Sequence, residues 1–253
     1  MIQGEYPSTS MKESRGDESL PQISNRAGDM MVERMSSTNP WNRQRKPSST
    51  RTVERESVSV NTVSPRLYPF TTTVGDLDVT FRRMDSADRD RMLAFTREIP
   101  ERDLHFLRYD ITDPQVVDEW IRNIGRGHTV TILAEESGQL IGYCSLHRSN
   151  ILWTRHLGEI RMLVGKNYRG KGIGRWLVQQ IFTFAQGMEL LKLTVNMMST
   201  QRDAQTLFHH LGFIPEALLH DWAIDRNGRT HDLIIMSREA DEDLEAEVRE
   251  SLL

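Results

Sequence analysis

From Asp76 onward, apolar residues recur along the chain with the periods of strands and helices. Alternating or short apolar runs bounded by turn residues predict strands at 77–83, 128–135, 140–146, 156–164, 190–196, 217–224 and 230–236. Apolar stripes at helical spacing, ended by caps, prolines or glycines, predict helices at 86–99, 104–108, 114–124, 172–187 and 201–211. The mixed order of these elements predicts an α/β fold with a partly antiparallel sheet.

Turn and cap residues support several of these boundaries. Ser137-Gly138 and Asn227-Gly228 each lie between two predicted strands, where such pairs favour a tight hairpin. Ser86 is the expected cap of the first helix, and Asp113 followed by Pro114 is typical of a helix start.

The first 75 residues differ in composition from the rest of the chain. They hold six of the nine prolines and 10 Lys+Arg against 8 Asp+Glu, which leaves 22 against 28, a net charge of −6, for residues 76–253. A segment without a sustained period buries too little apolar surface to offset its ordering entropy. We therefore predict a disordered tail at 1–75, a folded domain at 76–238 and an acidic tail at 239–253, with a start at Met30, Met31 or Met35 left open as an alternative.

Overall composition excludes some classes of protein. A mean hydropathy of −0.52 and the absence of a long apolar run predict no membrane segment. A single cysteine, Cys144, excludes an intrachain disulfide and a cysteine-based zinc site, so we expect no metal and a reducing compartment, the cytoplasm. The nearly balanced charge predicts no nucleic-acid partner, and the oligomeric state stays open, with a homodimer as one alternative.

The segment 164–174 has the strongest chemical signal in the chain. Its sequence is Val-Gly-Lys-Asn-Tyr-Arg-Gly-Lys-Gly-Ile-Gly, between a predicted strand and a predicted helix. Glycines at a helix start let backbone N–H groups face a pyrophosphate, and Arg169 and Lys171 add positive charge. Gly172 replaces the Ser/Thr of a Walker loop, and Arg175 replaces the third glycine of a dinucleotide fingerprint. A purely structural turn remains the alternative.

With its surroundings, this segment resembles the acetyl-CoA loop of the GNAT acetyltransferase superfamily. Arg169, Gly172 and Gly174 match the loop pattern of that family, and a second motif matches further along the chain. The residues of the second motif are Ala204, Leu207, Phe208, Gly212 and Phe213. The resemblance covers about residues 76–238 and implies a mixed, mostly antiparallel sheet that is splayed open and flanked by helices. It also implies acetyl-CoA as co-substrate and direct attack of an amine on the acetyl group.

The resemblance further implies a set of residues that bind acetyl-CoA. They are Leu163, Val164, Arg169, Gly170, Lys171, Gly172, Ile173, Gly174, Gln201 and Phe208. Gln201 stands where the family has Asn, and Phe208 where it often has a tyrosine that protonates the departing thiolate. Since a phenyl ring cannot donate that proton, a non-catalytic acyl-CoA-binding regulatory module is the alternative to an N-acetyltransferase.

An amine acceptor must lose a proton before it attacks, so a base is expected near the acetyl group. Glu159, on the strand before the loop, is the first candidate, with a structural Glu159–Arg161 pair as the alternative. His156 is the second candidate, because His147 and His156 bracket a strand connection that can line the acceptor site. Cys144 is expected to be a buried apolar residue rather than a nucleophile.

The acceptor itself is only broadly defined by the sequence. It is expected to be an amine on a small molecule or a protein, and the net charge of −6 favours a cationic one, such as a polyamine, an aminoglycoside or a lysine side chain.

Overall fold

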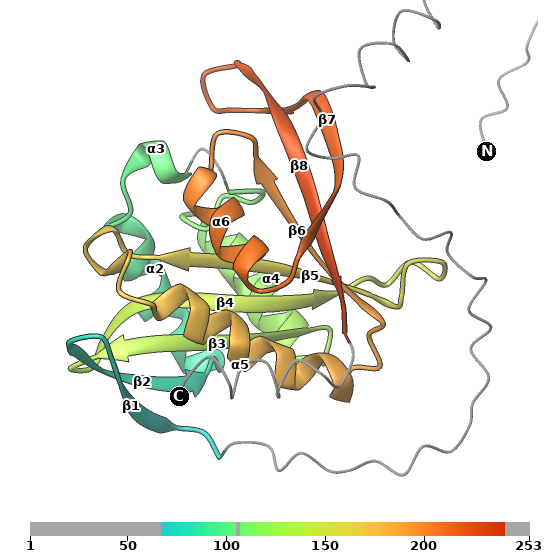
Figure 1. Ribbon diagram of the computed structural model, residues 1–253. Helices are drawn as coiled ribbons and strands as arrows, with labels where there is room; N and C mark the ends of the chain where they lie inside the picture. Colours follow the sequence, from blue (N-terminus) through green and yellow to red (C-terminus); the bar gives the residue numbers. More distant parts are fainter. Residues whose placement is uncertain (1–66, 105–106, 241–253) are drawn as a thin grey trace, which may run out of the picture. The chain divides into compact units, whose positions relative to one another are not determined.

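The computed structural model describes residues 67–104 and 107–240 of the 253-residue chain. Within these residues, eight strands form one sheet in the order β1-β2-β3-β4-β5-β6-β8-β7 (Figure 1). All neighbouring strands are antiparallel except β5 and β6. The strands are β1 Phe70–Val74, β2 Leu77–Arg83, β3 Thr129–Glu136, β4 Gln139–Arg148, β5 Leu157–Val164, β6 Lys192–Met198, β7 Ile214–Ile224 and β8 Thr230–Glu239. The expected mixed, mostly antiparallel sheet is confirmed.

Helices cover both faces of this sheet (Figure 1). The helix α5 (Ile173–Gly187) buries its apolar stripe in a core that includes Cys144 of β4. Helices α2 (Arg89–Arg97) and α4 (Pro114–Gly125) form a second core with the next residue of β4, Tyr143. Successive strand residues point to opposite faces, so these two cores lie on opposite sides of the sheet. The shorter helices are η1 Ser86–Asp88, α3 Glu101–Leu104, η2 Lys166–Tyr168 and α6 Arg202–His210.

None of the helices in the described ranges is long and apolar enough to span a bilayer. The expected tight turn at Ser137-Gly138 is present, with φ of 49° and 80°. These left-handed conformations are the ones that short hairpin turns require. At Asn227-Gly228 the hairpin forms through a longer connection between Ile224 and Thr230, in which only Gly228 of the pair is left-handed, with φ of 78°.

The folded domain starts earlier than the sequence predicted. Strand β1 pairs with β2, with Phe70 opposite Phe81 and Val74 opposite Leu77. The prediction of a tail up to residue 75 is therefore wrong for 70–74, because this five-residue strand is stabilised by pairing and burial in the sheet rather than by a long period of its own. Residues 1–66 and 241–253 lie outside the described part, and with them most of both predicted tails.

Two predictions between β2 and α4 are also wrong. Asp85, not Ser86, caps the first helix, because its carboxylate accepts the N–H of Ala87 at 2.7 Å. The second helix, α3, starts at Glu101 rather than at Leu104, because the carbonyl of Pro100 accepts the N–H groups of Asp103 and Leu104. Residues 105–106 of the predicted helix lie outside the described part.

Strands β5 and β6 separate partway along their length. Their parallel pairing runs from Leu157, opposite Lys192, to Ile160, opposite Val195, and then stops. The sheet therefore splays open between residues 161–164 of β5 and 196–198 of β6, as the resemblance implied.

Candidate active site

A cleft of about 1560 Å³ opens where β5 and β6 separate. Its walls include the ends of β5 and β6 that do not pair with each other, the glycine loop before α5, and α6. The α3–α4 connection, α4 and part of β7 also line it. The cleft therefore joins the predicted acetyl-CoA loop to the region where an acceptor was expected.

The glycine loop has the backbone that its sequence predicted. After Val164, the last residue of β5, the chain passes through η2 and reaches Gly170 and Gly172, with φ of 74° and 92°. Side chains rarely adopt these angles, so glycine is required at both positions. The helix α5 then begins at Ile173, which places a helix N-terminus beside the cleft.

Most of the predicted acetyl-CoA residues line this cleft. They are Leu163, Val164, Arg169, Gly170, Gly172, Gly174, Gln201 and Phe208. Lys171 and Ile173 do not line it: the ammonium of Lys171 pairs with Asp76 at 3.0 Å, and the side chain of Ile173 is fully buried in the α5 core. The side chains of these two residues therefore point away from the cleft, and their predicted role in binding rests on their backbone N–H groups.

Arg169 connects the loop to its surroundings. Its Nε donates to the carbonyl of Val164 at 3.0 Å, and its Nη2 lies 2.9 Å from Oδ2 of Asp103 on α3. The guanidinium thus holds the loop against the end of β5 as well as adding positive charge.

Two buried polar atoms in the cleft wall have no hydrogen-bond partner, Nε of Arg175 and Oδ1 of Asn196. Buried polar atoms are normally paired, so an unpaired donor and acceptor in one cleft fit a ligand that supplies both partners. A pyrophosphate suits the arginine beside the glycine loop, and an amide N–H of a pantetheine arm suits the asparagine. The sequence analysis missed both residues, although Arg175 directly follows the last glycine of the motif.

Gln201 and Phe208 occupy the ends of the α6 region. The Oε1 atom of Gln201 accepts the N–H of Met198 at 2.8 Å, which joins the start of α6 to the end of β6. Phe208 is 2% exposed and packs edge-on against Phe213, with ring centroids 5.1 Å apart. Phe208 is therefore mainly a core residue whose edge reaches the cleft.

Three charged residues form a cluster in the cleft wall, which we call the arginine cluster: Arg108, Glu159 and Arg161. Nη1 of Arg108 lies 2.8 Å from Oε2 of Glu159, and Arg161 donates to both carboxylate oxygens from Nε and Nη2, at 3.1 and 3.0 Å. The regular pairing of β4 and β5 confirms that Glu159 and Arg161 share one face. This ion pair is the structural role that the sequence analysis gave for Glu159 as the alternative to a catalytic base.

The arginines determine the protonation of Glu159. Burial acts to raise the pKa of its carboxyl, but the hydrogen bonds and charges of Arg161 and Arg108 outweigh burial, so the pKa lies below its ordinary value. Glu159 is therefore ionised at neutral pH and has a weak affinity for a proton.

Another polar group lies beside this cluster on the same face. His147 is opposite Glu159 in the β4–β5 pairing, and its ring nitrogens lie 2.8 Å from the hydroxyl of Ser145 and 3.1 Å from that of Thr129. Burial, with the positive charge of Arg161, lowers the pKa of His147 to about 3. His147 is thus neutral and held in place at physiological pH.

His156 is not part of the site. It is exposed, lies just before β5 and does not line the cleft, while its carbonyl accepts the N–H of Leu191 at 2.9 Å. The prediction of His156 as a second base is wrong, because the strand pairing places His147, not His156, beside Glu159.

Cys144 is fully buried on the α5 face, as expected, and burial raises the pKa of its thiol.

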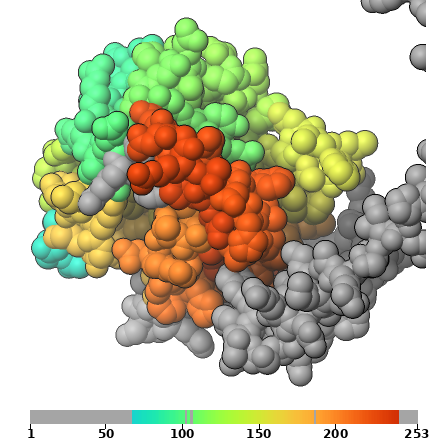
Figure 2. Space-filling model, turned by 90° about the horizontal axis from the view of Figure 1, so that it is seen from above, coloured from blue at the N-terminus to red at the C-terminus, as the bar shows by residue number. Residues whose placement is uncertain are grey.

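Aromatic and apolar residues cover the cluster. The ring of Tyr109 lies against Arg161, with 4.8 Å between the guanidinium carbon and the ring centroid, and Trp120 and Trp222 also line the cleft. Beyond it, Arg226 in the β7–β8 turn lies 2.8 Å from Asp110 in the α3–α4 connection. Figure 2 shows this hairpin, in red, against the green segment that follows α3.

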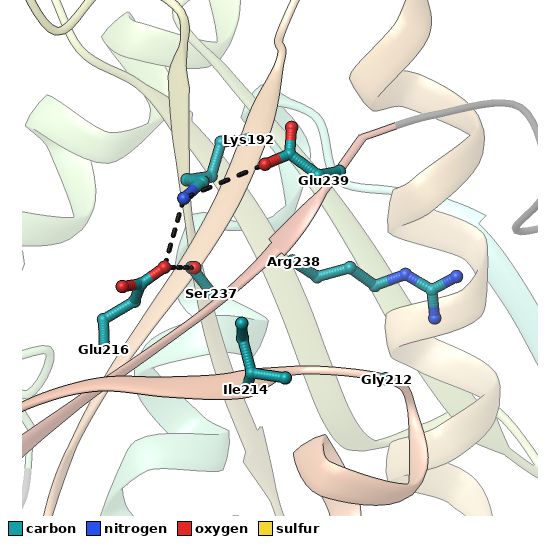
Figure 3. A pocket seen from close by; sticks show the side chains of 7 residues that line it. All are labelled: Lys192, Gly212, Ile214, Glu216, Ser237, Arg238 and Glu239. Atoms are coloured by element: carbon teal, nitrogen blue, oxygen red, sulfur yellow. Dashed lines mark hydrogen bonds and ion pairs between the residues drawn. The ribbon is translucent and has the colours of Figure 1, made fainter. Parts of the chain in front are cut away.

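A second, smaller pocket of about 290 Å³ lies near the start of β7 and the end of β8 (Figure 3). Its charges pair with one another: Lys192 lies 3.1 Å from Glu216, which also accepts from the hydroxyl of Ser237 at 2.6 Å. With its polar groups already paired, this pocket is a poor candidate for the functional site.

Comparisons with known proteins agree with this geometry. The acetyltransferase (GNAT) family model matches residues 93–213, which include β5, the glycine loop and α6. No curated protein matches the chain.

Solved acetyltransferases share the fold. A ribosomal-protein-alanine N-acetyltransferase from Brucella melitensis is 26% identical with a TM-score of 0.57, over 63% of this chain and 98% of that one. A putative acetyltransferase from Salmonella typhimurium, solved with its cofactor acetyl-CoA, is 23% identical with a TM-score of 0.58, over 65% and 95%. A ribosomal-protein-S5-alanine acetyltransferase from Vibrio fischeri is 17% identical with a TM-score of 0.58, over 69% and 97%. The matched part of this chain thus spans nearly the whole of each relative.

Proposed function

The chain belongs to the GNAT acetyltransferase superfamily, and from this we propose that it moves an acetyl group from acetyl-CoA to an amine acceptor by direct attack. One observation carries the proposal: the opening between β5 and β6 leads into the glycine loop at the start of α5, within a single cleft. A thioester can therefore lie beside the arginine cluster while its phosphates lie at the loop.

Residues of this chain would hold acetyl-CoA along the whole cleft. Main-chain groups of Leu163 and Val164, at the end of β5 that pairs with β4 but not with β6, would bond the pantetheine amides. The backbone N–H groups around Gly172 and the side chain of Arg175 would bind the pyrophosphate. When bound, acetyl-CoA supplies an activated acetyl group.

The amine would lose its proton to water rather than to a side chain. Glu159 has a low pKa because of its two arginines, and His147 has a pKa of about 3, so neither holds a proton well near pH 7. A lysine-like amine, with a pKa of about 10.4, would need about 4.6 kcal/mol to become neutral at pH 7. Glu159 instead fixes the positions of Arg108 and Arg161, and His147 keeps the adjoining wall neutral.

Phe208 leaves the departing thiolate without a proton donor at the usual family position. A thiol with a pKa of about 8.5 costs only about 2 kcal/mol to release as thiolate at pH 7, less than the cost of freeing the amine. We therefore expect turnover without a general acid.

Release of CoA thiol in the presence of an amine library tests the proposal. We expect release that depends on both acetyl-CoA and an amine, and none from a Gly172→Asp protein. Binding of acetyl-CoA without any thiol release across the library would instead favour the non-catalytic regulatory module.

A further inference from the structure

The arginine cluster has more positive than negative charge. It places two guanidinium groups, of Arg108 and Arg161, around the single carboxylate of Glu159. Glu159 engages Nη1 of Arg108 and Nε and Nη2 of Arg161. Because a guanidinium has several N–H donors in one plane, donors on each arginine stay available for a second anion.

The other carboxylates that line the cleft lie on other elements than the arginine cluster, and Asp203, in the first turn of α6, is one of them. Asp103 pairs with Arg169 at 2.9 Å, and Glu119 pairs with Arg122 at 2.7 Å. Asp113 caps α4 by accepting an N–H at 2.8 Å. The charge of −6 summed over residues 76–253 therefore does not describe this wall of the cleft, which carries a surplus of positive charge.

We propose that the acceptor is a primary amine that also carries a carboxylate, an α-amino acid or a close analogue, and that Arg108 and Arg161 bind this carboxylate. The proposal rests on the N-acetyltransferase function above and names its substrate class. Carboxylates pair with guanidinium groups through two parallel hydrogen bonds, which orient as well as bind. The amine, attached one carbon away, is then held in a fixed direction relative to the cluster.

The surrounding residues suit the rest of such a molecule. The ring of Tyr109 lies beside the guanidinium of Arg161, 4.8 Å from its central carbon, and limits the movement of this group. Trp120, Trp222 and Ile224 line the cleft and offer apolar surface to the side chain of an amino acid. The reaction balances as follows: the ammonium gives one proton to water, the neutral amine forms an N–C bond to the acetyl carbon, and the C–S bond breaks. The nitrogen then gives a second proton to water to become the amide, and the thiolate takes one proton from water.

Matched acceptors test the proposal on the full-length protein. We would compare kcat/KM for L-phenylalanine, L-phenylalaninamide and phenethylamine, and for L-leucine and isoamylamine. The kcat/KM for the amino acids should be at least about tenfold higher than that for the amines without a carboxylate. This is the effect of losing one hydrogen bond to a charged group. The amide is a strict control, because its amine loses a proton more readily than that of the amino acid, so intrinsic reactivity would favour the amide.

Substitutions in the arginine cluster test whether it causes the preference for acceptors with a carboxylate. Arg108→Gln should lower kcat/KM for L-phenylalanine by tenfold or more, and should lower kcat/KM for phenethylamine by a much smaller factor. The matched control is Arg122→Gln, which removes an exposed arginine that also pairs with one carboxylate but does not line the cleft, and should change neither value. Glu159→Gln should keep or increase the preference for the amino acid.

A binding measurement gives a second readout. With CoA present, tryptophan fluorescence should report tighter binding of N-acetylphenylalanine than of N-acetylphenethylamine, and Arg108→Gln should abolish the difference. Acetylation of amines without a carboxylate as readily as amino acids would overturn the proposal while leaving the N-acetyltransferase function intact. Acetylation of no amine at all would overturn both.

Discussion

Arg108 and Glu159, 51 residues apart in the sequence, meet in the cleft with 2.8 Å between Nη1 and Oε2. The pair joins the α3–α4 connection to β5, and its charge helps to hold the pKa of Glu159 below the ordinary value. In the proposed mechanism, this low pKa makes Glu159 a poor acceptor for the proton of an attacking amine.

The first prediction concerns pH. Because neither Glu159 nor His147 takes up a proton near neutrality, kcat/KM should rise about tenfold per pH unit until the pKa of the acceptor amine itself is reached. Measured with two amines of different pKa, the break in the profile should move with the amine. Glu159→Gln should lower kcat/KM by less than about tenfold without changing the slope, whereas loss of a general base would cost about 10²–10⁴-fold. A break at one fixed pH for both amines, absent in Glu159→Gln, would show that Glu159 is the base.

The second prediction concerns the glycine loop. Gly172→Asp should abolish the thermal stabilisation that acetyl-CoA gives, because the carboxylate would place a negative charge in the loop that binds the pyrophosphate and a side chain strains its left-handed backbone. Gly228→Asp is the matched control, since Gly228 also has a left-handed φ, 78° against 92°, but lies in the β7–β8 turn with open space around it. Equal stabilisation in both variants would remove the loop from the binding site.

A third prediction concerns the unpaired Nε of Arg175. Arg175→Met should weaken acetyl-CoA binding by about tenfold to hundredfold in calorimetry, because it removes a charged donor to the phosphates. The Tm of the free protein should not fall, since this atom has no hydrogen-bond partner to lose. Arg97→Met, at an exposed position of α2, is the control. Unchanged affinity in Arg175→Met would mean that the arginine does not face the ligand.

A fourth prediction concerns Phe208. Phe208→Tyr should raise kcat by at most about tenfold, because release of the thiolate is less costly than deprotonation of the amine. Steady-state rates at matched acetyl-CoA saturation measure the effect. A tyrosine variant that acetylates amines readily, while the natural protein binds acetyl-CoA equally well but acetylates none, would identify the natural protein as a binding module.

Local features of this chain could be predicted from its sequence, and long-range ones could not. The loop at Gly170 and Gly172 is encoded by adjacent residues, so its conformation followed from their spacing. The pairing of Glu159 with Arg161 followed from strand alternation. Arg108 reaches the same carboxylate only through tertiary packing, which no local pattern records.

The wrong predictions for His156 and for residues 70–74 also depend on long-range pairing that no local pattern records. His156 and His147 both border the predicted strand connection, and only the register between β4 and β5 shows that His147 lies opposite Glu159. Strand β1 is too short to have a recognisable period, and its pairing with β2 supplies the stability that its sequence alone does not.

The most direct test of the account is the ratio of N-acetylated amine to CoA thiol, measured together by mass spectrometry and thiol titration in one reaction. Direct attack of a bound amine predicts one acetylated amine for each CoA released, with negligible release when the amine is omitted. CoA release without acetylated product would show thioester hydrolysis, and neither product in the presence of bound acetyl-CoA would contradict acetyl transfer altogether.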